Sequence, residues 1–213
     1  MVRMSQTLVL GGNGFIGEPL VKALREAGTN VTAPTQAELD IETEPQKIVE
    51  ILENHDTLVI LTQPSEKGII NVVSALALSK VQHVLYASTV LVYGSSKEPQ
   101  SENAPLAPAS EYGRKKYGEE VALRHSLVPL TIVRLGNVYG GPKNRGIVQK
   151  AIEALYKNQL LQTSGEDQVR DFVHVDDVVV AIIALLKLPP NRSRVVNIMT
   201  GTGTSIGNMF KML

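Results

Sequence analysis

The sequence predicts an α/β protein built on a Rossmann-type, doubly wound parallel sheet that carries a small, reduced lobe. Apolar, strand-like segments alternate with helical segments of about ten residues, which is typical of βαβ units with helices on both faces of the sheet. A glycine-rich turn follows the first apolar segment directly, where such folds bind phosphate groups.

In the first half of the chain, residues 7–10 are apolar and end in a tight turn, which indicates a buried strand. Apolar residues then recur at helical spacing over 20–27, and Gly28 is a typical helix stop. Further strands are expected at 30–33, 37–41, 57–62 and 81–87, and further helices at 45–53 and 69–79.

In the second half, a loop rich in proline and serine at 95–110 precedes a helix at 111–124. A strand at 130–135 leads into a glycine-rich turn at 136–141. Helices are expected at 147–157 and 176–188, a strand at 195–198, and the start of one more helix near 205.

The composition restricts the possible classes of function. The 213 residues, 43% of them hydrophobic and 20% charged, suit one globular domain with or without a small lobe. Basic and acidic residues balance at 21 each, so neither a nucleic acid nor a membrane is expected as a partner. Without cysteine there is no thiolate catalysis. The longest apolar run, 178–186, is too short to cross a bilayer, and no signal peptide is recognisable, so we expect a cytoplasmic location.

Gly11, Gly14 and Gly17 stand three residues apart between the first strand and the first helix. Glycine suits a turn with unusual dihedrals, a backbone that approaches a pyrophosphate, and a helix packed close to the sheet. The helix N-terminus would add free N–H groups. The alternative is a plain glycine-rich turn. The second strand ends in Thr32-Ala33-Pro34-Thr35, with neither an acid nor an arginine, so the choice between NAD and NADP stays open.

Tyr112 and Lys116 lie four residues apart on the helix expected at 111–124, with Ser110 as a possible N-cap. To act as a base, a phenol with a pKa near ~10 must lose roughly three units, about 4 kcal/mol. A nearby ammonium and a positive nicotinamide ring supply stabilisation of that sign. The alternative is a solvated helix face, since the same spacing recurs in two glycine-rich turns, at Tyr93–Lys97 and Tyr139–Lys143.

An ordered series of motifs runs through almost the whole chain. It comprises Gly11-Gly12-Asn13-Gly14-Phe15-Ile16-Gly17, Asp40-Ile41, Ser88-Thr89, Val92-Tyr93-Gly94, Tyr112, Lys116, Glu120, Arg134, Asn137-Val138-Tyr139-Gly140, Pro142 and the run from Arg170 to Asp177. This series resembles the extended short-chain dehydrogenase/reductases, specifically the NAD-dependent epimerase/dehydratase family that acts on nucleotide sugars.

The resemblance implies roles for individual residues. Cofactor contacts would come from Gly11, Gly14, Phe15, Ile16, Gly17, Asp40, Ile41, Thr62, Tyr112 and Lys116. Among these, the glycines would hold the pyrophosphate, and Asp40 and Ile41 would recognise adenine. Thr89 would hydrogen-bond the reacting hydroxyl, Tyr112 would take its proton, and Lys116 would hold the nicotinamide ribose.

On the substrate side, Asn137 and Arg170 would contact the nucleotide diphosphate, which an arginine can bind in bidentate fashion. A salt bridge between Arg170 and a nearby acid such as Asp171 is the alternative. His174 stands between apolar residues and is expected in the core.

The sequence also departs from the family pattern. Val90-Leu91 replaces the Asp-Glu pair of the 4,6-dehydratases, so dehydratase chemistry is not expected. The stretch 62–69 is short where the family normally covers its cofactor. We expect a dinucleotide-binding core at 1–139, a small substrate-side segment at 140–170, and the returning helix and last strand at 171–213 with a truncated substrate lobe.

The leading hypothesis is therefore an NAD(P)-dependent enzyme, epimerase-like or reductase-like, that transfers hydride at a hydroxyl of a nucleotide sugar. NAD is the expected cofactor, with NADP left open, and no metal site is expected. The alternative is a non-catalytic sensor or partner-binding module, and an RNA-associated relative is weaker because no basic stripe is present. The resemblance also implies a possible homodimer that pairs through the helix of Tyr112.

Overall fold

A computed structural model describes residues 6–96, 98–161, 163 and 165–213. Its main sheet has six parallel strands in the order β2-β1-β3-β4-β5-β8. Their bounds are β1 Gln6–Leu10, β2 Asn30–Thr32, β3 Thr57–Ile60, β4 His83–Thr89, β5 Leu130–Leu135 and β8 Arg194–Ile198. The chain runs from β1 outward to β2 and then returns past β1 to β3. This reversal is the switch point at which a doubly wound sheet opens a crevice at the carboxyl ends of its strands.

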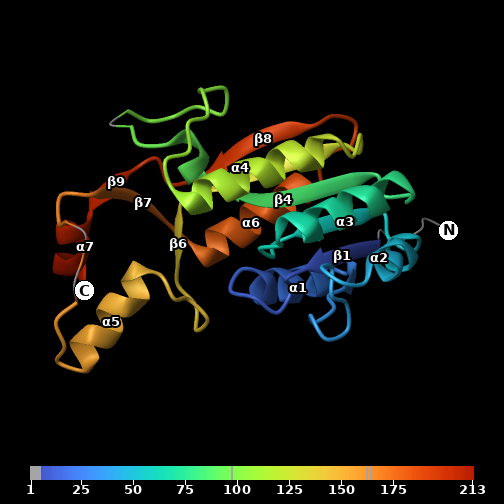
Figure 1. The fold of residues 1–213 in the computed structure, drawn as a ribbon. Coiled ribbons are helices and arrows are strands. Elements are labelled where there is room, and N and C mark those ends of the chain that lie inside the picture. The colour runs from blue at the N-terminus through green and yellow to red at the C-terminus, as the bar shows by residue number, and fades with distance from the viewer. Residues whose placement is uncertain (1–5, 97, 162, 164) are drawn as a thin grey trace.

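Helices cover both faces of this sheet, which confirms the predicted fold class (Figure 1). On one face, α2 (Pro45–Leu52), α3 (Glu66–Ala77) and α4 (Glu111–Arg124) pack side by side. On the other face, α1 (Gly17–Glu26) packs against α6 (Val175–Leu186). In the part of the chain that the structure describes, no helix has both the length and the apolar character needed to cross a membrane.

The core lies in two layers because strand side chains alternate between the faces of the sheet. Leu8 and Leu10 of β1 join the cluster under α2, α3 and α4, whereas Val9 joins the cluster under α1 and α6. All three are buried. Burial on both faces explains why the strands are apolar throughout instead of alternating with polar residues.

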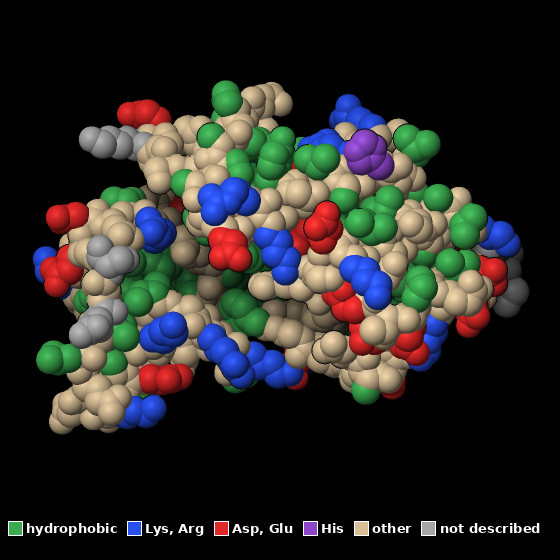
Figure 2. Space-filling model, viewed as in Figure 1, with side chains coloured by type: hydrophobic (Ala, Val, Ile, Leu, Met, Phe, Trp, Pro, Cys, Tyr) green, Lys and Arg blue, Asp and Glu red, His purple; other side chains and the backbone are tan. Residues whose placement is uncertain are grey.

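A small lobe lies at one end of the main sheet (Figure 1). Its three-stranded sheet joins β6 (Asn137–Tyr139), β7 (Val169–His174) and β9 (Gly203–Ser205), with β7 parallel to β6 and antiparallel to β9. Two helices complete it, α5 (Ile147–Tyr156) and α7 (Ile206–Met212), which share a buried cluster of Ala151, Ile206 and Met209. The molecular surface is hollowed between this lobe and the main sheet (Figure 2).

The strand expected at 37–41 was wrong, because these residues form turns. Their backbone is bonded by local side chains instead of a neighbouring strand. Glu38 accepts hydrogen bonds from the amide and hydroxyl of Thr35, and Glu44 accepts one from the amide of Asp40. Leu39 is nonetheless buried in the core, which explains the misleading apolar pattern.

Four elements were not predicted: β6, β7, β9 and a 3-10 helix, η1, at Val90–Tyr93. In addition, α3 begins at Glu66, three residues before the expected start, because the Ser65 hydroxyl caps it by accepting from the amide of Gly68.

Candidate active site

The turn between β1 and α1 needs glycine at two positions for reasons visible in the backbone. Gly11 has a φ of +83°, which L side chains rarely adopt. A Cβ on Gly17 would lie 2.1 Å from the carbonyl oxygen of Gly11, so the first turn of α1 packs directly on the loop. This packing holds the loop residues Gly11, Asn13 and Gly14, which line a cleft above β1, next to the start of α1.

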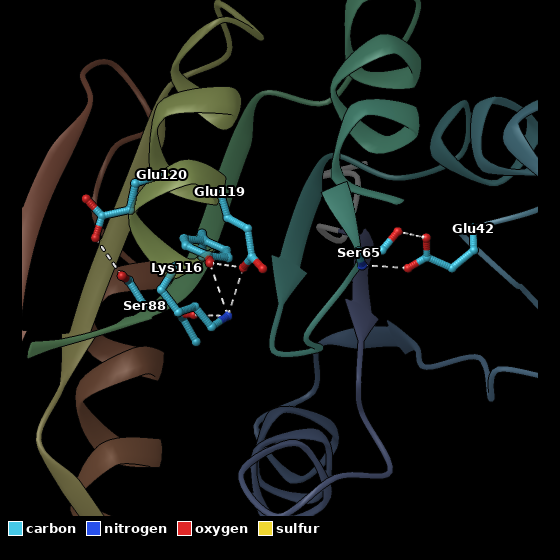
Figure 3. Close-up of polar contacts among 8 residues, drawn as sticks. Glu42, Ser65, Ser88, Lys116, Glu119 and Glu120 are labelled. Atoms are coloured by element: carbon cyan, nitrogen blue, oxygen red, sulfur yellow. Dashed lines mark hydrogen bonds and ion pairs between the residues drawn. The ribbon is translucent and has the colours of Figure 1, made fainter. Parts of the chain in front are cut away.

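A first cleft opens above β1 and β3. Among the residues that line it are five of the predicted cofactor residues: Gly11, Gly14, Asp40, Ile41 and Thr62. Its rim is fixed by Glu42, whose carboxylate accepts hydrogen bonds from the Ser65 amide, at 2.8 Å, and from the Ser65 hydroxyl (Figure 3). Burial opposes the charge on Glu42, but these bonds outweigh it and hold the pKa of Glu42 below its usual value.

A second cleft continues from the first, since Gln63 lines both. It brings together Phe15 and Ile16 of the glycine-rich loop, Thr89 at the end of β4, Tyr112 on α4 and Asn137 on β6. Residues predicted to contact the cofactor and residues predicted to act on the substrate therefore share one crevice, at the carboxyl ends of the central strands.

Tyr112 and Lys116 both lie on α4, whose first residue is Glu111 and whose N-cap is Ser110. Tyr112 faces the second cleft and is 40% exposed, whereas Lys116 is 3% exposed. The ammonium nitrogen of Lys116 lies 3.0 Å from Oε2 of Glu119, 3.1 Å from the hydroxyl of Tyr86 and 3.2 Å from the carbonyl oxygen of Ala87 (Figure 3). An ammonium has three hydrogens, so these acceptors use all of them and none is directed at Tyr112.

The electrostatic environment of the pair differs from the sequence-based expectation. Burial and the Glu119 carboxylate raise the pKa of Tyr112 instead of lowering it. Burial lowers the pKa of Lys116, and the ion pair with Glu119 opposes that effect. Burial and Glu119 also raise the pKa of Tyr86, so Tyr86 remains a hydrogen-bond donor to Glu119.

A second buried network fixes α4 to the sheet. Glu120 binds the guanidinium of Arg134 through both oxygens, at 3.0 Å from Nε and 2.7 Å from Nη2. Glu120 also accepts a 2.5 Å hydrogen bond from Ser88 (Figure 3). Arg134 in turn donates to the hydroxyl of Tyr93, at 2.9 Å. This network holds α4 against the end of β4, where Thr89 lies.

The two other tyrosine–lysine spacings have different surroundings. Tyr93 is buried and bonded to Arg134 and Asn197, and Lys97 lies outside the described residues. Lys143 donates to the carbonyl oxygen of Asn13 and pairs with Glu18, which ties the loop after β6 to the glycine-rich turn.

On the substrate side, Arg170 and Asn137 line two further hollows in common, next to the small lobe. The guanidinium of Arg170 donates to the carbonyl oxygen of Val169 and to the side-chain oxygen of Gln168, both uncharged. The alternative salt bridge with Asp171 is not formed, because the Asp171 carboxylate accepts from the amides of Thr200 and Gly201 instead.

His174 is only partly buried. Its Nδ1 accepts from the amide of Asp176, so it caps α6 and is not the core histidine that we expected.

Sequence reasoning missed several residues of this region. Gln63 directly follows Thr62 and Ser88 directly precedes Thr89, so strand position could have indicated both. Glu119 and Tyr86 gave a weaker signal. Glu119 lies one helical turn from Lys116, but only the fold shows that both side chains point into the interior.

The family model described as "NAD dependent epimerase/dehydratase family" matches residues 7–198. A putative UDP-glucose 4-epimerase of Methanocaldococcus jannaschii is 29% identical, over 97% of this chain and 80% of its own length. A GDP-6-deoxy-D-talose 4-dehydrogenase of Aggregatibacter actinomycetemcomitans is 30% identical, over 97% of this chain and 78% of its own length.

Two solved structures share the fold closely. MoeE5, in complex with UDP-glucuronic acid and NAD, has a TM-score of 0.88 at 26% identity, covering 98% of this chain and 81% of its own. TunA, an NAD-dependent NDP-hexosamine 5,6-dehydratase, has a TM-score of 0.84 at 25% identity, covering 98% of this chain and 80% of its own.

Proposed function

The chain belongs to the NAD-dependent epimerase/dehydratase family, and from this premise we propose that it is a nucleotide-sugar epimerase that works by reversible hydride transfer at a hydroxyl of the sugar. The observation that carries the proposal is the second cleft. There Thr89, Tyr112 and Asn137 lie in one crevice with Phe15 and Ile16 of the glycine-rich loop. A hydroxyl, its proton acceptor and the cofactor must meet in such a place.

NAD is the cofactor of this family, and the residues of the first cleft fit it. Gly11 and Gly17 let the loop backbone pack closely at the start of α1, because a Cβ at either position would meet backbone atoms, and the amides of this loop would bind the pyrophosphate. Asp40 and Ile41 line the same cleft and would hold the adenine, and Thr62 lies beside Gly11, where it would also contact the cofactor. When bound, NAD supplies the acceptor and donor of the hydride.

The chain's own residues would accept and return the proton of the sugar hydroxyl. Thr89 would hydrogen-bond the sugar hydroxyl, and Tyr112, as phenolate, would accept its proton as general base. The keto sugar would then take hydride on its other face, and Tyr112 would return the proton. Asn137 and Arg170 would hold the diphosphate, and the uncharged partners of Arg170 leave its positive charge for that anion.

The favoured outcome is epimerisation without net redox change. The archaeal relative carries the name of an epimerase, which supports this choice. Net oxidation is the nearest competitor, because another relative is named as a 4-dehydrogenase. We propose that dehydration is not the reaction, because Val90 and Leu91 follow Thr89 and neither side chain can transfer a proton. The fold itself does accommodate dehydration, as TunA demonstrates.

The test is to incubate the purified protein with NAD and UDP-glucose or GDP-sugars and to identify products by NMR. We expect a sugar epimer without accumulation of NADH. Net NADH formation would identify a dehydrogenase, and loss of water from the sugar a dehydratase. NAD binding without turnover of any nucleotide sugar would favour a non-catalytic module.

Tyr112→Phe should reduce turnover by at least about a hundredfold, since it removes the general base. Calorimetry should show a nearly unchanged Kd for NAD. Tyr117→Phe is the matched control, because Tyr117 lies on the same helix and is 39% exposed, against 40% for Tyr112. Equal activity in wild type and Tyr112→Phe would contradict the assignment.

A further inference from the structure

The ion-pair partner of Lys116 is a buried carboxylate on α4, the helix that also carries Tyr112. Glu119 is 3% exposed, and its Oε2 accepts hydrogen bonds from both the ammonium of Lys116 and the hydroxyl of Tyr86. Its other oxygen, Oε1, is buried and has no hydrogen-bond partner among the described residues. All polar contacts of this carboxylate are therefore concentrated on the oxygen that faces Lys116 (Figure 3).

We propose that Glu119 is a positioning residue for the reaction: it holds Lys116 against β4 and offsets its charge, and so controls the proton affinity of Tyr112. The inference rests on the proposed role of Tyr112 as general base. Glu119 itself would touch neither the substrate nor the cofactor.

The geometry supports this role in two ways. First, Lys116 can turn toward a ribose or a phenolate only by giving up one of its three present acceptors, two of which, Glu119 and Tyr86, are bonded to each other. Second, Lys116 and Glu119 form a nearly neutral unit, so the attraction that would favour a phenolate at Tyr112 is largely cancelled.

No other charged group described near Lys116 would take over the effect of Glu119. On α4 itself, Lys115 and Glu120 also act on Lys116, but Glu120 is engaged with Arg134. From the sheet, Tyr86 faces the ammonium. From α3, Glu66 lines the groove between α3 and α4 that Glu119 also lines. Among these groups Glu119 alone forms an ion pair with Lys116.

The decisive experiment is to titrate the single phenol of Tyr112 by NMR. Protein labelled with ¹³C at tyrosine Cζ gives one signal for each of the six tyrosines, and Tyr112→Phe assigns the signal of interest. In Glu119→Gln the Tyr112 midpoint should fall by about one pH unit or more, with and without NAD, because the carboxylate whose negative charge disfavours the Tyr112 phenolate is removed. An unchanged or higher midpoint would overturn the proposal.

Tyr86→Phe separates charge from packing, since it removes the hydroxyl but keeps the carboxylate of Glu119. Its effect on the midpoint should be clearly smaller, and a shift as large as in Glu119→Gln would overturn the proposal. If Glu119→Gln does not fold, Glu119→Met offers the same loss of charge with similar volume.

Turnover gives the second readout. The acid limb of the kcat profile should move to lower pH in Glu119→Gln by the same amount as the NMR midpoint. If wild-type protein has no turnover at all, the proposed function fails, but the titration still decides the role of Glu119.

Discussion

At the residue scale, the close packing at Gly17 makes a sharp prediction. Gly17→Ala places a methyl group 2.1 Å from the Gly11 carbonyl oxygen and 2.7 Å from the Cα of Gly12, both of which are backbone. We expect a loss of about 2 kcal/mol or more in the free energy of unfolding, measured in urea, together with loss of NAD binding by calorimetry.

Gly118→Ala is the control for that variant. Gly118 lies within α4, and a Cβ there would meet nothing within 4 Å. This substitution should stabilise the protein by about 0.5–1 kcal/mol, because alanine loses less entropy in a helix. Equal effects of the two substitutions would argue against close packing at the loop.

His83 gives a prediction about pH. It is buried, with Nε2 2.8 Å from the Thr131 hydroxyl, and burial together with the charge of Arg194 lowers the pKa of His83. The unfolded chain then binds more protons than the native protein once the pH falls below about 6.5, the ordinary value for histidine. The contribution of a neutral His83 to the free energy of unfolding should therefore be fully present above that pH and should decline as the pH falls below it. Urea unfolding between pH 7.5 and 5.5 should show this decline in wild type and a flatter profile in His83→Gln.

Most individual site residues could be proposed from the sequence because motif order fixes their position along strands and helices. Thr89 ends β4 and Tyr112 is the second residue of α4, so both reach the cleft once the fold forms. The surroundings of Lys116 could not be proposed, because Tyr86 and Glu119 are 33 residues apart and only the packing of α4 on β4 joins them. The pKa of Tyr112 differed from expectation for the same reason.

At the element scale, α4 depends on its first turn. The Ser110 hydroxyl accepts from the amide of Gly113, at 3.0 Å, and Tyr112 lies within that turn. Ser110→Ala should cost about 1 kcal/mol of stability, measured by thermal unfolding. It should also lower kcat more than Ser205→Ala, which removes the equivalent cap of α7. A larger effect of Ser205→Ala on kcat would contradict the importance of the α4 cap for Tyr112.

Elements with a clear local sequence signal were predicted well, whereas several that depend on distant partners were not. The helix at 111–124 and the strand at 130–135 have the predicted bounds. By contrast, β6 and β9 have three residues each, too few to show a period, and pair with strands distant in the sequence. Their existence depends on tertiary contacts that no local pattern contains.

At the scale of the whole molecule, α3 and α4 form an outer layer, and no other described segment of the chain lies over it (Figure 1). Apolar side chains lie between charged ones on this face (Figure 2). Ile70 is 52% exposed and Val121 is 40% exposed. These side chains offer apolar area on two adjacent helices that a second copy of the chain would cover in a twofold dimer. The homodimer therefore stays a prediction, now with a defined face.

Light scattering should give a mass of twice 23.1 kDa for wild type. Val121→Arg should convert the protein to the monomer, because two copies of the same face meet in a twofold interface and each variant charge would be buried. Val180→Arg is the control, since Val180 is 67% exposed but lies on α6, on the opposite face of the sheet. A monomeric wild type, or equal dissociation by both substitutions, would show that the α3–α4 face is not the interface. Because α4 also carries Tyr112 and Lys116, dissociation should lower turnover as well if the partner subunit steadies that helix.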